Sequence, residues 1–227
     1  MKDLRSHKAH LQDYFNSIGF DRWSAIYDGE SDLSSIRQSV REGHAIMLAQ
    51  AKMWLMERHA GGKLLDAGCG TGLFSLQMAR MGFDVNAYDI APRMIAAASD
   101  AAQQAQLGDH IQFAVGDVEA TTGTYDAVAC FDVLIHYPQD AFATMCQHLI
   151  ARTEDTLLLT YAPYNALLAA MHWVGGWFPS SQRRTEIQMI RDHHVDAILN
   201  QGGMNITRRE RISQGFYHVV LLEATRR

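Results

Sequence analysis

Apolar and polar positions alternate along the middle of the chain in a way that predicts strands and helices in turn. Short, mainly apolar runs at residues 63–67, 84–89, 111–115, 125–131 and 156–160 predict five strands. Segments at residues 73–81, 94–105 and 141–149 repeat their apolar positions at helical spacing and predict helices. Strands that alternate with helices of this length indicate βαβ units and a parallel sheet.

The two ends of the chain follow other patterns. Residues 8–59 predict helical segments that break near residues 28–30, and residues 36–58 have clear helical spacing. Near the other end, two strand-like runs between residues 205 and 225 meet at Gly215 and predict an antiparallel hairpin. We therefore expect an α/β fold with a seven-stranded, mostly parallel sheet, an antiparallel terminal hairpin and an N-terminal helical cap.

We expect the cap to occupy residues 1–45 and one α/β domain to occupy residues 46–227. The alternation pauses after Thr160, and a segment inserted at about residues 163–195 is expected to lie over a substrate. Residues 131–135 extend the fourth strand as a buried run toward a turn at Pro138. Asp132 and His136 interrupt this run, and His136 is either a core histidine or a residue of a binding site.

Composition limits the classes of protein and the cellular compartment that fit this fold. The 227 residues are 48% hydrophobic and 20% charged, which is enough apolar sequence for a sizeable core. A net charge of −5 argues against a nucleic-acid partner, because nucleic-acid-binding surfaces are usually basic. Three scattered cysteines predict neither a disulfide framework nor a metal site. The polar first residues lack a signal peptide's apolar core, and no run of 18 apolar residues is present, so we expect a cytoplasmic protein.

The strongest motif is DAGCGTG at residues 66–72, which follows the first strand and opens a helix. Its glycines allow a tight turn and a close approach to a ligand, and the amides of the helix N-terminus point at that ligand. Asp89 ends the second strand 19 residues after Gly70, where an acid can accept hydrogen bonds from both ribose hydroxyls. The GxGxG spacing differs from the GxGxxG of dinucleotide-binding turns and from the phosphate-binding loop.

This motif resembles motif I of the class I methyltransferases, which have a Rossmann-like fold. The resemblance implies that S-adenosyl-L-methionine binds at the turn and leaves as S-adenosyl-L-homocysteine, with Asp66 helping to hold its amino group. Gly116-Asp117-Val118 resembles a later motif, in which Asp117 accepts a hydrogen bond from the adenine amine and the Val118 amide donates to a ring nitrogen. Further cofactor contacts are expected from Trp23, Tyr27, His44, Gly68, Cys69, Gly70, Asp89, Ile90 and Phe131.

Other segments narrow the resemblance: YFNSIGFDRWSAIYDGE at residues 14–30, REGHA at 41–45, FDVLIHYP at 131–138, YAP at 161–163 and FPSS at 178–181. Together with DAGCGTG they resemble the magnesium-protoporphyrin IX O-methyltransferases of chlorophyll and bacteriochlorophyll synthesis, over nearly the whole chain. The resemblance implies methyl transfer to one propionate of magnesium-protoporphyrin IX. It also implies catalytic roles for Tyr27, beside a hinge at residues 28–30, and for His136.

The acceptor chemistry limits what His136 has to do. A propionate has a pKa of about 4–5, so it is already ionised at neutral pH and needs no strong base. We expect His136 to orient this carboxylate first, and to act as a general base only where the acid keeps its proton. The position of His136 after the fourth strand favours a place in the site, because ligands of open α/β sheets bind at the carboxyl ends of the strands.

The porphyrin is large, flat and mainly apolar, so it needs an apolar cleft with polar groups at its edge. The residues expected to contact it are Phe20, Trp173, Trp177, Phe178, Arg183 and Arg184. The aromatic residues among them equally suit core packing, and the two arginines equally suit a solvated helix start. His172, His193 and His194 are weak candidates for an axial contact to magnesium, which prefers oxygen ligands.

The resemblance further implies delivery of the porphyrin by the porphyrin-binding subunit of magnesium chelatase, and peripheral contact with photosynthetic membranes. Two other functions fit the same motifs. One is a methyltransferase of the same fold that acts on another small molecule, such as a quinone precursor. The other is a non-catalytic protein that keeps the cofactor pocket.

Overall fold

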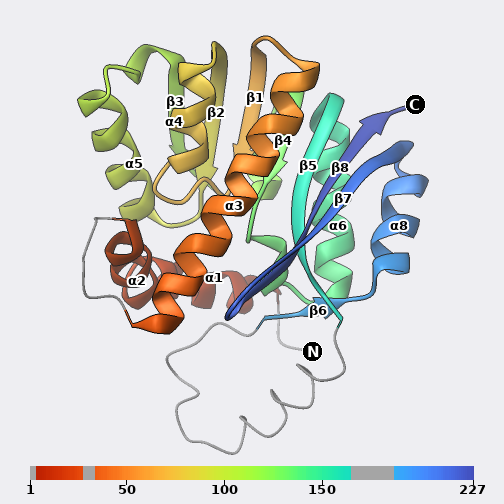
Figure 1. Ribbon diagram of the computed structural model, residues 1–227, viewed down its shortest axis with the longest axis horizontal. Helices are drawn as coiled ribbons and strands as arrows, with labels where there is room; N and C mark the ends of the chain where they lie inside the picture. Colours follow the sequence, from red (N-terminus) through yellow and green to blue (C-terminus); the bar gives the residue numbers. More distant parts are fainter. Residues whose placement is uncertain (1–3, 28–33, 165–186) are drawn as a thin grey trace, which may run out of the picture.

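A computed structural model describes residues 4–27, 34–164 and 187–227 of the chain (Figure 1). In these residues one sheet has the strand order β3-β2-β1-β4-β5-β8-β7, and the short β6 pairs with β5 outside this path. All neighbouring strands are parallel except β8, which runs antiparallel to β5 and to β7. The fold class expected from the sequence is therefore confirmed, including the antiparallel terminal hairpin.

The strands have the following bounds: β1 Gly62–Ala67, β2 Phe83–Asp89, β3 Ile111–Val115, β4 Tyr125–Cys130, β5 Thr153–Pro163, β6 Met189–Ile190, β7 Met204–Gln214 and β8 Tyr217–Arg226. The α-helices are α1 Leu4–Phe15, α2 Ile18–Tyr27, α3 Ser35–Arg58, α4 Leu73–Arg80, α5 Pro92–Gln104, α6 Gln139–Arg152 and α8 Asp192–Gln201. Short 3-10 turns lie at Gly108–His110 (η1), Val118–Ala120 (η2) and Leu134–His136 (η3).

The sheet has an apolar core on each face, because successive side chains of a strand point to opposite sides. Leu64 packs with the face covered by α3 and α4, whereas its neighbour Leu65 packs with the face covered by α6 and α8. Both leucines are fully buried, and burial of each contributes about 1.5–3 kcal/mol. Leu157 and Leu158 divide between the two cores in the same way, so the central strands are held from both sides.

The first two helices lie across the end of the sheet at which the parallel strands finish (Figure 1). Three contacts fix α1 there: Gln12 donates to the carbonyl of Ile90 at 2.9 Å, the His7 ring nitrogen lies 2.8 Å from the carbonyl oxygen of His136, and Leu11 is buried in the α6 core. The cap therefore closes over the edge where ligands of such sheets bind.

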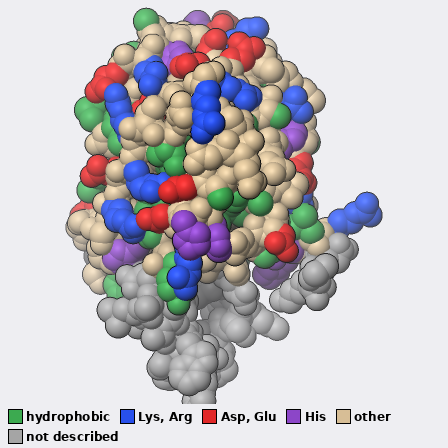
Figure 2. Space-filling view, turned by 90° about the vertical axis from the view of Figure 1, so that its right-hand side faces the viewer, with side chains coloured by type: hydrophobic (Ala, Val, Ile, Leu, Met, Phe, Trp, Pro, Cys, Tyr) green, Lys and Arg blue, Asp and Glu red, His purple; other side chains and the backbone are tan. Residues whose placement is uncertain are grey.

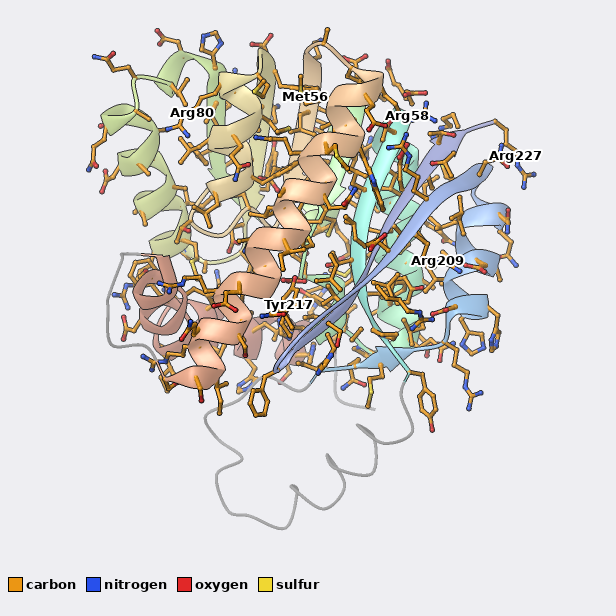
Figure 3. All side chains as sticks on the ribbon, viewed as in Figure 1. Met56, Arg58, Arg80, Arg209, Tyr217 and Arg227 are labelled. Carbon is orange, nitrogen blue, oxygen red and sulfur yellow. The ribbon has the colours of Figure 1, made fainter. Side chains whose placement is uncertain are left out.

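The long helix α3 lies along the β7–β8 hairpin. Its N-terminal half contacts the hairpin tip, where the Phe216 amide donates to Ser39 at 3.1 Å and Gln214 donates to Glu42 at 2.8 Å. A Cβ on Gly43 would lie 2.5 Å from a Tyr217 ring carbon, so the glycine lets the ring approach the helix. Figure 3 shows Tyr217 and Arg58 near opposite ends of this contact. The hairpin thereby sets the position of α3 beside the site.

Three details differ from the expectations. The predicted strand at residues 131–135 is wrong: β4 ends at Cys130, because the Asp132 amide donates to the Thr160 hydroxyl at 2.7 Å and Asp132 takes a φ of 56°. The cap boundary at residue 45 falls inside α3, which is one continuous helix. The boundary of the inserted segment at residue 195 falls inside α8, whose Val195 is buried in the core.

The face that carries α8 and the β7 edge mixes basic and acidic side chains (Figure 2). Arg209 pairs there with Asp196, and Arg211 pairs with Asp192. Tyr161 also donates to Asp192 at 2.9 Å, which ties β5 to the start of α8. These two ion pairs link β7 to α8 across this face.

The buried acid Glu223 supplies a test of how α3 is held. Its carboxylate, which is 0% exposed, lies 2.5 Å from Arg58 of α3 and 3.2 Å from Arg208 of β7. Glu223→Gln should lower the free energy of unfolding by about 1.5–3 kcal/mol, because hydrogen bonds to charged groups contribute about this much. Urea denaturation measures this change.

Glu57→Gln is the matched control for this variant. Glu57 contacts the same Arg208 at 2.7 Å, but its side chain is 51% exposed. Its substitution should cost less than about 1 kcal/mol, as for other exposed ion pairs. Equal losses in the two variants would show that the buried carboxylate does not hold α3.

Candidate active site

A cavity lies between the carboxyl ends of β1, β2, β3 and β4 and the helices α1, α2 and α3. It gathers most of the residues that the sequence marked. Those lining it are Trp23, His44, Asp66, Gly68, Cys69, Gly70, Asp89, Ile90, Asp117, Val118, Phe131 and His136. Residues from six separate segments of the chain thus meet at one edge of the sheet.

The glycine-rich turn has the backbone geometry that its sequence predicts. Gly68 and Gly70 have φ values of 86° and 53°, which favour glycine. A Cβ on Gly68 would lie 2.0 Å from a methyl carbon of Val133, so no larger residue fits without a shift. The amides of Gly68 and Cys69 both donate to the carbonyl of Tyr88, at 2.7 and 2.9 Å. These bonds fasten the turn to the end of β2.

Asp89 joins the turn to the neighbouring strand. One carboxylate oxygen accepts from the Gly70 amide at 2.9 Å, and the other accepts from the Ala91 amide at 2.8 Å. Burial raises the pKa of Asp89, while the two amide bonds oppose this shift. Each oxygen keeps further acceptor capacity, so the carboxylate is placed to accept from a ligand hydroxyl in the cavity.

Asp66 is the more deeply buried acid, with 2% of its surface exposed. Ser75 of α4 donates to it at 2.6 Å, which links the end of β1 to the helix that follows the turn. Burial raises the pKa of Asp66 to about 6, and the nearby Asp89 adds to this shift. Its clearest role in the structure is therefore to fix the turn against α4.

Asp117 and Val118 follow β3, at the far end of the cavity from β4. Lys8 of α1 contacts both Asp117, at 2.6 Å, and Glu119. This ion pair was not expected from the sequence, because the residues lie more than 100 positions apart. It holds the cap over the end of the cavity that suits a purine ring.

His136 lies in η3, with 9% of its surface exposed, and it lines the cavity. The ring of Phe15 from α1 meets the His136 ring edge-on, with 5.3 Å between the ring centroids. The histidine is thus both buried and adjacent to the site, which reconciles the two interpretations left open by the sequence.

Sequence reasoning missed several residues of this cavity. Leu11 and Phe15 of α1 and Tyr137 form apolar parts of its wall. Asp132 also lines it, and its carboxylate receives hydrogen bonds from Tyr217 and Thr160. An acid that interrupts an apolar run at a strand end is the only sequence signal that pointed to Asp132.

The structure does not bring every predicted residue to the cavity. Phe20 lies outside the lining, and the Arg93 guanidinium stacks over its ring at 4.1 Å. His193 and His194 lie on α8 with their rings 4.2 Å apart. Tyr27 ends α2, but its side chain lies outside the described part of the chain. Outside the described residues altogether are His172, Trp173, Trp177, Phe178, Arg183 and Arg184.

The described residues contain no group of three or more His, Cys, Asp or Glu side chains that could hold a metal ion. The arrangement instead suits an elongated organic ligand. Acids stand at the ends of three strands, with a glycine-rich turn and the N-terminus of α4 between them. Such an edge binds a nucleoside with a polar tail.

Two family models match the chain. Residues 130–226 match the C-terminal region of magnesium-protoporphyrin IX methyltransferases, and residues 64–154 match a general methyltransferase domain. A curated relative, the magnesium-protoporphyrin O-methyltransferase of Synechocystis, is 35% identical over 222 residues and is covered over 96% of both chains. The chloroplastic magnesium protoporphyrin IX methyltransferase of Arabidopsis thaliana is 35% identical over 220 residues, which is 96% of this chain and 70% of the relative.

A crystal structure of the Synechocystis magnesium protoporphyrin IX methyltransferase with bound S-adenosylhomocysteine superposes with a TM-score of 0.88 at 34% identity. The match covers 97% of this chain and 100% of that one. By contrast, a ubiquinone biosynthesis O-methyltransferase of Psychrobacter cryohalolentis is 36% identical over only 52% of this chain.

Asp66→Asn tests the burial of the first acid through pH. Because the folded-state pKa is raised from 3.8 to about 6, the folded protein holds a proton that the unfolded chain has released. Stability from this group therefore falls as pH rises between about 4 and 6. The unfolding free energy of the parent minus that of the variant should drop by about 2 kcal/mol from about pH 4.5 to about pH 7. A constant difference in urea titrations would contradict this burial.

Asp89→Ala tests the second acid through binding. Loss of its acceptor oxygens should weaken S-adenosylhomocysteine binding by about 10–100-fold in calorimetry, as for other charged hydrogen-bond partners. Asp84→Ala is the control, because Asp84 lies on the same strand but its side chain is 79% exposed. Unchanged affinity in the Asp89 variant would remove Asp89 from the site.

Proposed function

Because the chain belongs to the magnesium-protoporphyrin IX O-methyltransferase family, we propose that it methylates one propionate carboxylate of magnesium-protoporphyrin IX. The methyl donor is S-adenosyl-L-methionine, and the products are the monomethyl ester and S-adenosyl-L-homocysteine. This reaction belongs to chlorophyll and bacteriochlorophyll synthesis.

The observation that supports this function best is the order of groups along the cavity. Following the strand order β3-β2-β1-β4, the cavity presents Asp117, then Asp89, then the glycine-rich turn, and finally the segment with His136. The first three suit an adenine, a ribose and the backbone of an amino acid. The sulfonium of S-adenosylmethionine joins the ribose to the amino acid, and His136 lines the same cavity on its β4 side, where it can face an acceptor of the methyl group.

The chain's residues have mainly to align the reactants. When bound, S-adenosylmethionine supplies an electrophilic methyl group on a positively charged sulfur. The charges of the sulfonium and of the attacking carboxylate both disappear as they react, so a strong cationic grip on the carboxylate would oppose the reaction. A ring at His136 that donates one hydrogen bond can aim the carboxylate without holding its charge. Alignment of the two reactants by the whole site can supply about 7–11 kcal/mol, of which this hydrogen bond is one part.

The cap also has a chemical role in this proposal. Leu11 and Phe15 of α1 and the buried Tyr137 place apolar surface over the cavity. Exclusion of water strengthens the electrostatic interactions inside and protects the methyl donor from hydrolysis. Since α1 contacts Ile90, Asp117 and His136, it covers both the side of the cavity that suits adenine and the side that carries His136.

We keep Tyr27 as a second catalytic candidate, and Phe20, Trp173, Trp177, Phe178, Arg183 and Arg184 as candidates for porphyrin contact. Delivery by the porphyrin-binding subunit of magnesium chelatase and peripheral contact with photosynthetic membranes belong to the same proposal. Among the described helices, none is both long enough and apolar enough to cross a bilayer.

A mass-spectrometric assay tests the proposed reaction. Incubation with S-adenosylmethionine and magnesium-protoporphyrin IX should add one methyl group to the porphyrin. Transfer to a phenolic quinone precursor but not to the porphyrin would favour the alternative small-molecule methyltransferase. Cofactor binding in calorimetry without transfer to either acceptor would favour a non-catalytic protein.

Two variants test the role of His136. His136→Ala should lower kcat by about 100-fold, the cost of about 1 Å of misplacement, while the Kd for S-adenosylhomocysteine stays within about twofold. His136→Asn should retain more activity than the alanine variant, because an amide can still donate to a carboxylate. His193→Ala, at an exposed position on α8, should match the parent.

The outcomes separate three roles for His136. Parental kcat in both His136 variants would make it a core residue. An equal loss of kcat in the alanine and asparagine variants would make His136 a general base, if kcat of the parent protein also rises with pH across the range in which histidines titrate. Partial activity in the asparagine variant alone supports orientation.

A further inference from the structure

Asp132 is an unusual residue for its place in the chain. It follows the end of β4 and has a φ of 56°, in the left-handed region that residues with a side chain rarely adopt. Such a conformation costs on the order of 1 kcal/mol and persists only where surrounding contacts enforce it. Backbone strain of this kind is common at ligand sites.

The contacts that enforce it also aim the carboxylate. Tyr217 of β8 donates to one oxygen at 2.8 Å, and Thr160 of β5 donates to the other at 3.0 Å. Thr160 is fully buried and also accepts from the Asp132 amide at 2.7 Å. Figure 3 shows Tyr217 near the tip of the β7–β8 hairpin, next to α3 and beside the edge where the parallel strands finish. Two strands thus hold the carboxylate at the wall of the cavity.

This carboxylate has acceptor sites that its two hydroxyl donors do not use. An ionised carboxylate has about four acceptor sites, and the two hydroxyl donors use one on each oxygen. The nearest described cationic candidate is His44, whose ring nitrogen lies 3.9 Å from Asp132. Burial lowers the pKa of His44, while Asp132 opposes that shift.

The strand order identifies which part of the ligand reaches Asp132. The purine end suits Asp117 after β3 and the ribose suits Asp89 after β2, so the ligand runs past β1 toward β4. The part that arrives there is the amino-acid tail, which bears a primary ammonium group and a carboxylate. Asp66 also lines this region, but it is 2% exposed and accepts from Ser75.

We propose that Asp132, held by Tyr217 and Thr160, is the principal anionic partner of the α-ammonium group of S-adenosylmethionine and S-adenosylhomocysteine. This inference rests on the proposed function only for the identity of the cofactor. The ring of His44 lies beside Asp132, with 3.9 Å between its nitrogen and the Asp132 carboxylate, and a ring N–H there can donate to the carboxylate of the same amino-acid tail. The pair thereby fixes the tail, and with it the direction in which the methyl group points.

Calorimetry with two ligands tests this assignment. The ligands are S-adenosylhomocysteine and its deamino analogue, which lacks only the ammonium group. The parent protein should bind S-adenosylhomocysteine at least 10-fold more tightly than the analogue, because charged hydrogen bonds contribute about 1.5–3 kcal/mol. Asp132→Asn should lose at least 10-fold in affinity for S-adenosylhomocysteine and stay within about twofold for the analogue.

Tyr217→Phe is the matched variant, because it keeps the Asp132 charge and removes one hydrogen bond that aims it. It should weaken S-adenosylhomocysteine binding by several-fold, less than Asp132→Asn does. It should also leave affinity for the analogue within about twofold.

Several outcomes would overturn the assignment. Equal affinity of the parent protein for S-adenosylhomocysteine and for its deamino analogue would already overturn it, because the ammonium group would then contribute nothing to binding. Equal losses for the two ligands in Asp132→Asn would make Asp132 a support of the turn alone, and no loss for either would remove it from the site. The proposed function is tested separately: normal discrimination between these ligands with no methylation of magnesium-protoporphyrin IX would contradict the reaction and leave Asp132 in place.

Discussion

The hydrogen bond from the Gly70 amide to Asp89 is the constraint on which the rest of the site depends. It joins a turn after β1 to the end of β2 across 19 residues, at 2.9 Å. A turn with glycines in the left-handed region has little rigidity of its own, so this bond and the two amide bonds to Tyr88 fix its shape. The hydrogen bond from Ser75 to Asp66 then fixes the start of α4 against the end of β1, and the turn forms one wall of the cavity.

The two halves of the cavity are completed from distant parts of the chain. At the β3 end, Lys8 brings α1 onto Asp117. At the β4 end, the hairpin and α3 bring Tyr217 and His44 to Asp132. Both ends therefore depend on contacts outside the glycine-rich turn. A ligand that spans the cavity touches all of these segments at once, so its binding and the packing of the cap onto the sheet should stabilise each other.

The sequence predicted the sheet and many of the residues that line the cavity, because the signals for both are local. Periodicity marks each strand, and DAGCGTG with Asp89 lies within one βαβ unit. Asp132 was missed as a site residue because its partner Tyr217 lies 85 positions away and no local pattern joins them. A non-local contact also explains why the strand predicted at residues 131–135 is wrong. The run is apolar, but the Asp132 amide donates to the Thr160 hydroxyl, and the pairing of β4 with β5 ends there.

The most direct measurement follows a trideuterated methyl group from S-adenosylmethionine into magnesium-protoporphyrin IX. If the acceptor is a carboxylate, each porphyrin should gain one label as a methyl ester. Mild alkali should then hydrolyse this ester and release the label as trideuterated methanol. A label that survives alkaline hydrolysis, or that appears only on a phenol, would contradict a carboxylate acceptor and with it the alignment role given to His136.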